Sequence, residues 1–181
     1  MDLLEFRDVA AWESWLALHH ADASEAWLRI AKRGSAVQTL PISDALDGAL
    51  CWGWIDGQRR GHDAGSFAQR YCPRRPRSSW SQVNVAKVEA LAAAGRMRPP
   101  GLAQVAAAQA DGRWAAAYAS QRTAEVPPDL AAALAASPRA AAAFAGLGRS
   151  ERYQVILALL KTPTEEGRSR VLARAVERLE E

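Results

Sequence analysis

The spacing of apolar residues changes along the chain, and this change is the first guide to its fold. Near the N-terminus, apolar or aromatic positions recur at intervals of three or four residues, at Val9, Trp12, Leu16 and His19. This is the period of a helix, and Asp8 stands where it can cap the first turn. A second, short helix is expected after Ser43, whose hydroxyl can cap it, with Gly53 as its end.

Three segments alternate in the way that favours strands, over residues 26–32, 54–60 and 66–72. The last two flank Gly61–Gly65, a run of turn residues, so they are expected to form a hairpin. The sequence therefore predicts the α+β class, with a small antiparallel sheet packed on helices in the N-terminal half.

Beyond residue 80 the pattern is helical throughout. Ser79 and Gln82 have the spacing of a capping box, which predicts a helix that runs to Gly95. Thr162–Glu165 predicts a second box, with Pro163 at the first helical position. The glutamate and the two prolines of residues 125–128 indicate a boundary. We therefore expect an α+β domain over residues 1–125 and a helical subdomain over residues 126–181.

Composition narrows the class of protein. The chain has 181 residues, of which 49% are hydrophobic, and this is typical of a globular domain. No apolar run approaches the ~20 residues that span a bilayer, and the acidic N-terminus lacks the features of a secretory signal. We expect a cytoplasmic protein without membrane insertion. Its two cysteines form no Cys-x-x-Cys pair, so neither a metal nor another cofactor is predicted.

Charge is unevenly distributed along the chain. The net charge is +3, but residues 56–98 hold nine basic residues against three acidic ones, or +6. The basic residues are Arg59, Arg60, Arg70, Arg74, Arg75, Arg77, Lys87, Arg96 and Arg98. Such a segment can attract anions, although a solvated arginine surface is the simpler interpretation. Nucleic-acid binding is expected to be weak at most, because no reading motif accompanies the charge.

The stretch from Ala49 to Arg59 combines two glycines with Trp52 and Trp54, which implies large rings packed close to backbone. Asp56 lies among arginines, so an aspartate–arginine pair is expected, with the pKa of the carboxyl lowered. Such a pair need not belong to a functional site. The alternative is that Asp56 has a structural role, in a buried ion pair that holds Arg59 or Arg70 in place.

The stretch from Pro73 to Asn84 is expected to begin as extended backbone rich in arginine and to end in the first turn of a helix. Exposed amides and the guanidinium groups of Arg74 and Arg77 suit a phosphate or carboxylate there. Trp80, Asn84 and Lys87 are spaced to share one face of the helix. Alternatively, Trp80 belongs to the core and Asn84 ties the loop to the helix.

Together these stretches predict a site for a small anionic ligand, such as a nucleotide-like one. The predicted site residues are Trp54, Asp56, Arg59, Arg74, Arg77, Trp80, Asn84 and Lys87. We expect Asp56, Arg59, Arg77 and Asn84 to converge on one pocket. An enzyme that uses Asp56 as a general base is the alternative. The sequence favours binding over catalysis, because it has no Gly-rich phosphate loop, nucleophile elbow or His-Glu-x-x-His motif.

Residues 45–57 and 73–84 resemble the YdeI/OmpD-associated family, also called bacteriocin-protection proteins. The likeness extends to residues 12–20, 95–97 and 111–114, and residues 126–179 are similar to the family's helical module. The resemblance implies an association with envelope stress and bacteriocin resistance, without a defined reaction. One departure is Gly167, which precedes Arg168 where the family has threonine. A glycine inside a helix costs ~1 kcal/mol, so we expect this helix to start late or bend.

Overall fold

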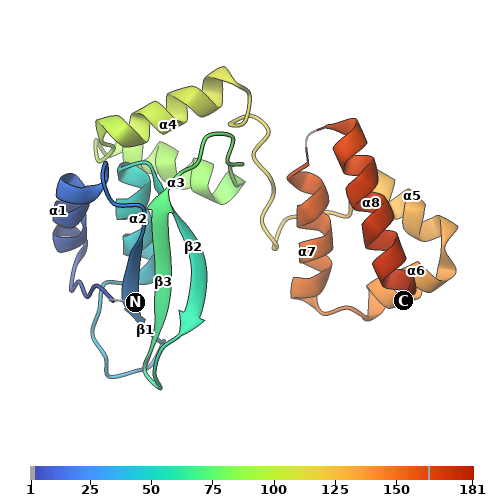
Figure 1. Ribbon diagram of the computed structural model, residues 1–181, viewed down its shortest axis with the longest axis horizontal. Helices are drawn as coiled ribbons and strands as arrows, with labels where there is room; N and C mark the ends of the chain where they lie inside the picture. Colours follow the sequence, from blue (N-terminus) through green and yellow to red (C-terminus); the bar gives the residue numbers. More distant parts are fainter. Residues whose placement is uncertain (1–2, 163) are drawn as a thin grey trace. The chain divides into compact units, whose positions relative to one another are not determined.

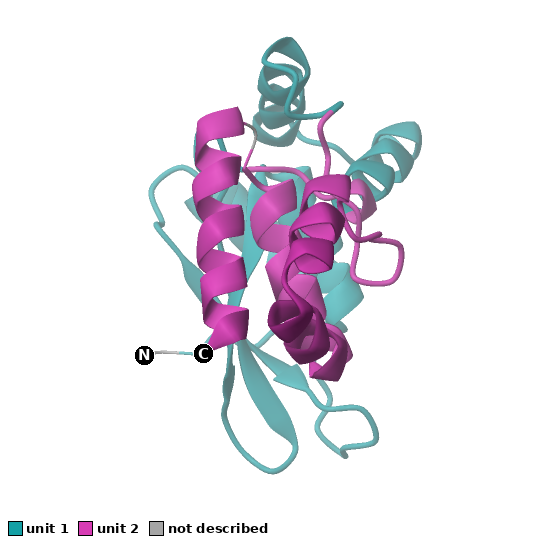
Figure 2. Ribbon diagram, turned by 90° about the vertical axis from the view of Figure 1, so that its right-hand side faces the viewer, with its two compact units in different colours: residues 1–78, 84–115 teal, residues 79–83, 116–181 magenta. Residues whose placement is uncertain are grey.

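The computed structural model describes residues 3–162 and 164–181 (Figure 1). Its contacts divide the chain into two compact units (Figure 2). The N-terminal unit comprises residues 1–78 and 84–115, and the C-terminal unit comprises residues 79–83 and 116–181. The predicted α+β class is confirmed, because an antiparallel sheet lies in the N-terminal half and helices follow it.

The sheet of the N-terminal unit has three strands among the described residues, β1 (Ala26–Ala31), β2 (Trp54–Gly61) and β3 (Ser66–Pro73). They are antiparallel in the order β1-β3-β2, and each lies within one residue of its predicted range. Asp63 closes the hairpin, because its Oδ1 accepts the backbone N–H groups of Gly65 (2.8 Å) and Ser66 (2.6 Å). The sheet leaves β2 at an edge.

Helices α1 (Val9–His19) and α2 (Ile42–Cys51) pack on one face of this sheet (Figure 1). Asp8 caps α1 as predicted, accepting the N–H of Ala11 at 2.9 Å. The indole N–H of Trp12 donates to the Ala45 carbonyl at 2.9 Å and ties α1 to α2. The core is formed mainly by Trp12, Leu16, Leu28, Ile30, Leu40, Trp54 and Tyr71.

The predicted caps of α2 and of the helix after it are wrong. Helix α2 begins at Ile42, because the Pro41 carbonyl already accepts the N–H groups of Asp44 and Ala45, so Ser43 lies inside the helix. Helix α3 (Gln82–Ala93) begins three residues after the predicted cap at Ser79. Residues before it pair with a distant segment instead: Ser81 bridges Tyr118, and the N–H of Gln82 donates to the Tyr118 carbonyl at 2.9 Å.

Helix α4 (Pro99–Ala110) approaches α2 at backbone contact distance. The N–H of Arg98 donates to the Cys51 carbonyl at 3.0 Å, and a Cβ on Gly101 would lie 2.3 Å from that same oxygen. Only glycine therefore fits position 101 in this packing.

The described part of the C-terminal unit contains helices and the Ser81–Tyr118 bridge. Its helices are α5 (Pro128–Ala136), α6 (Pro138–Gly146), α7 (Arg149–Leu160) and α8 (Glu165–Glu180). Arg168 joins three of them, because it donates to both carboxylate oxygens of Asp129 (2.6 and 2.9 Å) and to the Leu159 carbonyl (2.8 Å). Among the described residues, no helix is both long and apolar enough to cross a membrane.

The start of α8 also differs from the prediction. Thr164, not Thr162, is the cap, and its hydroxyl oxygen accepts the N–H of Gly167 at 3.3 Å. The predicted role of Pro163 lies outside the described residues. A Cβ on Gly167 would stand 2.7 Å from the Thr164 hydroxyl, so the glycine is compatible with this close cap. The helix accordingly begins at Glu165, later than predicted from Pro163.

The contact between α4 and α2 generates a test of the fold. Gly101→Ala should lower the free energy of unfolding by about 1–3 kcal/mol, because the new methyl group must displace backbone. Gly146→Ala is the matched control: nothing lies within 4 Å of its Cβ position, so helix propensity should leave stability equal or slightly higher. Urea unfolding of both variants measures this, and parental stability of Gly101→Ala would contradict the packing.

Candidate functional site

A β-bulge in edge strand β2 is the structural basis of the candidate site. Asp56 pairs with Tyr71 and Arg59 pairs with Gln69, so β2 has one more residue than β3 between these pairs. In a regular strand, residues 56 and 59 would point to opposite faces. Because Tyr71 and Gln69 share a face of β3, the bulge brings Asp56 and Arg59 to the same face.

Gln69 holds this bulge from inside the sheet. Its side chain is 2% exposed, and its Nε2 donates to the carbonyl oxygens of Gly57 (3.1 Å) and Gln58 (3.3 Å). Its Oε1 accepts from Nε of Arg59 at 3.2 Å. The guanidinium of Arg59 also lies 4.4 Å from the ring centroid of Phe67. The orientation of Arg59 is thus determined by two neighbours on β3.

Asp56 is the acidic member of the site, and its environment differs from the prediction. Although the residue as a whole is exposed, the surrounding protein partly desolvates the carboxylate and raises its pKa. Its own backbone N–H and the charges of Arg74 and Arg59 lower the pKa, but they do not outweigh desolvation. The predicted lowering is wrong, because it considered nearby arginines without the loss of water.

The predicted aspartate–arginine ion pair is also absent among the described residues. Arg70 pairs with Glu25 at 2.5 Å, and Arg59 is engaged by Gln69. Asp56 therefore forms no ion pair within 4 Å in the described part of the chain. Directly opposite it, the buried hydroxyl of Tyr71 has no hydrogen-bond partner among the described residues, and burial together with the Asp56 charge raises its pKa.

Arg74 is the buried cation of this region. It is 5% exposed, its Nη1 donates to the Ser78 hydroxyl at 3.0 Å, and its backbone N–H donates to the Gly53 carbonyl at 3.0 Å. A guanidinium keeps its charge even when buried, and the charge of Arg74 acts to lower the pKa of Asp56. The structure thus brings together Asp56, Arg59 and Arg74.

Two other predicted site residues have structural contacts. Trp54 is 1% exposed in the core, packs edge-on against Trp12 and Trp15, and donates its indole N–H to the His20 carbonyl at 3.2 Å. Lys87 donates to Asp47 at 2.6 Å and thereby joins α3 to α2.

The remaining predicted residues are Arg77, Trp80 and Asn84. Arg77 is exposed in a turn after β3, and Asn84 is half-buried in the first turn of α3. Trp80 is buried and precedes α3, and its carbonyl accepts the N–H of Tyr118. The predicted helix face of Trp80, Asn84 and Lys87 is therefore wrong, because α3 begins only at Gln82. Trp80 belongs to the C-terminal unit.

Much of the basic charge predicted from residues 56–98 is neutralised within the N-terminal unit. Carboxylates from earlier elements provide the partners: Glu25 for Arg70, Asp47 for Lys87 and Glu13 for Arg96. Arg59, Arg60, Arg75 and Arg77 form no ion pair within 4 Å among the described residues. The unpaired charge is thus confined to β2 and to the turn after β3.

Metal and thiol chemistry receive no support from the geometry. Within the described ranges, no group of three or more His, Cys, Asp or Glu residues could hold a metal ion. Cys51 is fully buried, and desolvation raises the pKa of its thiol to about 11, so it is protonated near neutrality.

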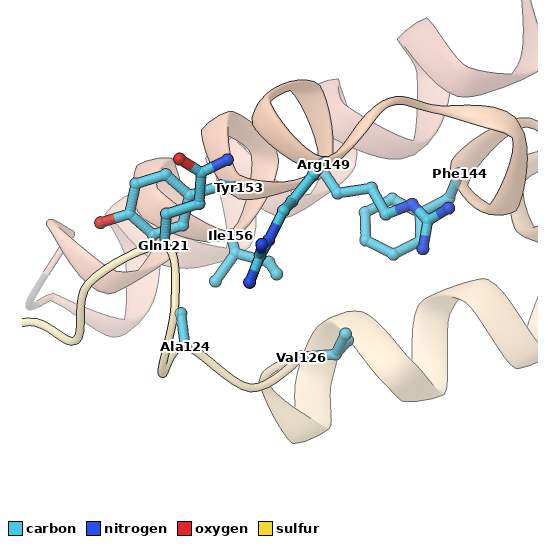
Figure 3. Close-up of a pocket in the computed structure, with 8 residues that line it drawn as sticks. Gln121, Ala124, Val126, Phe144, Arg149, Tyr153 and Ile156 are labelled. Carbon is cyan, nitrogen blue, oxygen red and sulfur yellow. The ribbon is translucent and has the colours of Figure 1, made fainter.

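Sequence reasoning missed a cavity in the C-terminal unit. It has a volume of about 300 Å³ and is lined by residues that include Gln121, Phe144, Arg149 and Tyr153 (Figure 3). These residues come from the segment before α5 and from α6 and α7, and no local motif joins them. The one sequence feature that could have pointed to this cavity was Arg149, which follows the helix break at Gly146–Gly148.

The fold and the strand-edge site define an α+β protein with a helical unit at its C-terminal end. Comparison with protein families gives one match in the N-terminal part of the chain and another in the C-terminal part. Residues 4–104 match the family described as a domain of unknown function (DUF8412), and residues 123–181 match the family described as bacteriocin-protection, YdeI or OmpD-associated. Because the first match covers more than half of the 181 residues, the chain belongs to the DUF8412 family.

The predicted resemblance to the bacteriocin-protection family is confirmed by the match over residues 123–181. The two central motifs, in contrast, lie within the stretch matched by the DUF8412 family. Comparisons with curated proteins and with solved structures found no match.

The raised pKa of Asp56 makes stability depend on pH. Ionisation costs more in the folded state than in the unfolded state, where the ordinary pKa is 3.8, so the penalty is present at neutral pH and disappears as the pH falls through the raised pKa. Asp56→Asn should therefore unfold at higher urea concentration than the parent at pH 7. Its advantage should narrow towards pH 4.

The control for this measurement is Asp22→Asn, which alters an exposed aspartate outside the site. It should leave the urea midpoint unchanged at both pH values. Destabilisation of Asp56→Asn at pH 7 would instead indicate that the carboxylate is a net stabilising partner of the arginines.

The small number of unpaired arginines limits nucleic-acid binding. We expect duplex DNA to bind with a Kd weaker than about 10 µM at physiological salt, and the affinity to fall further as salt rises. Fluorescence anisotropy with two unrelated duplexes measures both effects. Tight, sequence-dependent binding at that salt concentration would refute this interpretation.

Proposed function

We propose that this chain is a bacteriocin-protection-associated protein that binds a small anion at the cationic edge of its N-terminal unit. The match over residues 123–181 supports the association with that family. The anion site comprises Arg59 and Arg74, the turn that carries Arg77, and the carboxyl of Asp56. The observation that carries the proposal is the backbone conformation of Arg77.

Residues Arg75–Ser78 form a turn that the Ser78 N–H closes onto the Arg75 carbonyl at 3.1 Å. Pro76 occupies its second position, and Arg77 follows with a φ of 67°. Glycine or asparagine normally occupies such a left-handed position, and another residue costs about 1–2 kcal/mol there. Arg77 is the non-glycine residue with positive φ in the described part of the chain. Strain of this kind at an exposed cation supports a functional role.

The charges around this turn fit an anion. The side chains of Arg75 and Arg77 form no hydrogen bond or ion pair among the described residues, whereas Arg70 and Lys87 are paired. The planar guanidinium offers parallel N–H donors that match a phosphate or a carboxylate. The raised pKa of Asp56 is compatible with this ligand, because desolvation makes the negative charge that would repel an anion less favourable.

An enzyme that uses Asp56 as a general acid or base is the second candidate. It is favoured by the unpaired state of Asp56 and by its raised pKa, since a general base works best when its pKa approaches the working pH. Arg59 and Arg74 would then hold a phosphorylated or carboxylated substrate. In a screen of phosphate and carboxylate esters, Asp56→Asn would abolish turnover but keep ligand-induced stabilisation. Turnover that survives in this variant would exclude Asp56 as the base.

Arg77→Gly separates binding from folding. Glycine relaxes the left-handed turn and removes the guanidinium, so the stability of the ligand-free variant should stay within about 1 kcal/mol of the parent. Inorganic phosphate, AMP and citrate are the probes, and at least one should raise the Tm of the parent. That increase should be lost, or fall at least severalfold, in Arg77→Gly.

The matched control is Arg33→Gly, which removes an exposed arginine from the turn after β1 in the same unit. Its Tm should rise with the probe as the parent's does. The proposal fails if no probe shifts the parent, or if Arg77→Gly and the parent respond equally.

A further inference from the structure

The cavity of the C-terminal unit combines two kinds of lining. Its volume is about 300 Å³, which is at the small end of the range for ligand sites. The apolar lining consists of Ala124, Val126, Phe144 and Ile156, and the polar lining of Gln121, Arg149, Arg152 and Tyr153. In Figure 3, Gln121 and Tyr153 lie at one end of the cavity and Phe144 at the other, with Ile156 between them.

Most polar groups of the lining are already engaged. The Tyr153 hydroxyl donates to the Ala119 carbonyl at 3.0 Å, and Nε2 of Gln121 donates to the Ser150 hydroxyl at 3.2 Å. Arg152 donates to the carbonyl oxygens of Leu147 (2.9 Å) and Ala145 (2.7 Å). These bonds fix the walls of the cavity.

Arg149 differs from these neighbours. Its side chain forms no hydrogen bond or ion pair in the described part of the chain, and the residue is exposed at the start of α7. It also lines an adjoining cavity of about 350 Å³ together with Ser120, Gln121 and Arg122. Its guanidinium can therefore be reached by a ligand in either cavity.

Among the described residues, no carboxylate lines either cavity. The acidic residue nearest to Arg149 in sequence, Glu151, accepts the N–H of Gly148 at the N-cap of α7 at 2.8 Å, and Glu125, between Ala124 and Val126, is exposed and is not part of the lining. The cavity consequently offers a cation without an internal counterion, next to a Phe144 ring and an exposed Val126 (41%). A concave lining of apolar and aromatic side chains with a few polar groups is typical of small-molecule sites.

We propose that this cavity binds a carboxylate with a compact apolar body, such as an aryl or branched alkyl carboxylic acid. Arg149 pairs with the carboxylate, and Phe144, Ile156 and Val126 receive the apolar body. Inorganic phosphate can pair with Arg149 but has no apolar body. This site is separate from the anion site of the N-terminal unit, which is built from Arg59, Arg74 and Arg77.

Isothermal titration of the full chain with four probes tests the proposal. We expect 3-phenylpropionate to bind with one-to-one stoichiometry. Its uncharged amide, acetate and inorganic phosphate should each compete with 3-phenylpropionate at least about tenfold more weakly, because each lacks the charge or the apolar body; phosphate bound at the N-terminal anion site does not compete. An amide that binds as tightly as the acid, or phosphate that competes equally, would overturn the assignment.

Variants locate the binding within the unit. Arg149→Gln should weaken 3-phenylpropionate binding at least about tenfold. Val126→Asp, which places a carboxylate at an exposed lining position, should abolish it without unfolding the protein. Arg174→Gln is the control, because Arg174 lines a different cavity between α7 and α8, of about 400 Å³. Loss of binding in Arg174→Gln with retention in Arg149→Gln would place the ligand there and refute the proposal, as would an absence of binding to the parent.

Discussion

One extra residue in β2 is the constraint on which the N-terminal site depends. Without the bulge, Asp56 and Arg59 would face opposite sides of the sheet. The bulge leaves carbonyl oxygens of β2 without ladder partners, and the buried Gln69 amide satisfies them while its oxygen orients Arg59. A polar side chain in the centre of the sheet thus stabilises an irregular edge strand and sets the geometry of the charged groups on it.

Local sequence patterns predicted the positions of the strands and helices well, but they predicted the N-terminal ends of the helices less well. Alternation and turn residues located β1, β2 and β3, because each strand's pattern lies within its own few residues. The cap at Ser79 failed for a tertiary reason: Ser81 and Gln82 pair with Tyr118, and this pairing keeps the preceding backbone out of α3. At Ser43, the preceding proline had already started the helix.

The candidate site was predictable in its residue types but not in its pairings. Arginines that crowd together in sequence suggested Asp56 as their partner, yet Glu25 and Asp47, 45 and 40 residues away from Arg70 and Lys87, neutralise them. Asp56 is left unpaired and desolvated, and this reverses the expected sign of its pKa shift. The cavity around Arg149 was invisible for the same reason, because its lining is assembled from three separate segments.

The central claim is that anions are recognised where β2 and the turn after β3 present unpaired arginines. The most direct measurement is a titration of the ¹⁵N-labelled chain with AMP, followed by the ¹H–¹⁵N shifts of each backbone amide. Our account predicts saturable shifts concentrated in residues 56–59 and 74–78. Saturable shifts confined to other parts of the chain, or no shifts at millimolar AMP, would contradict it.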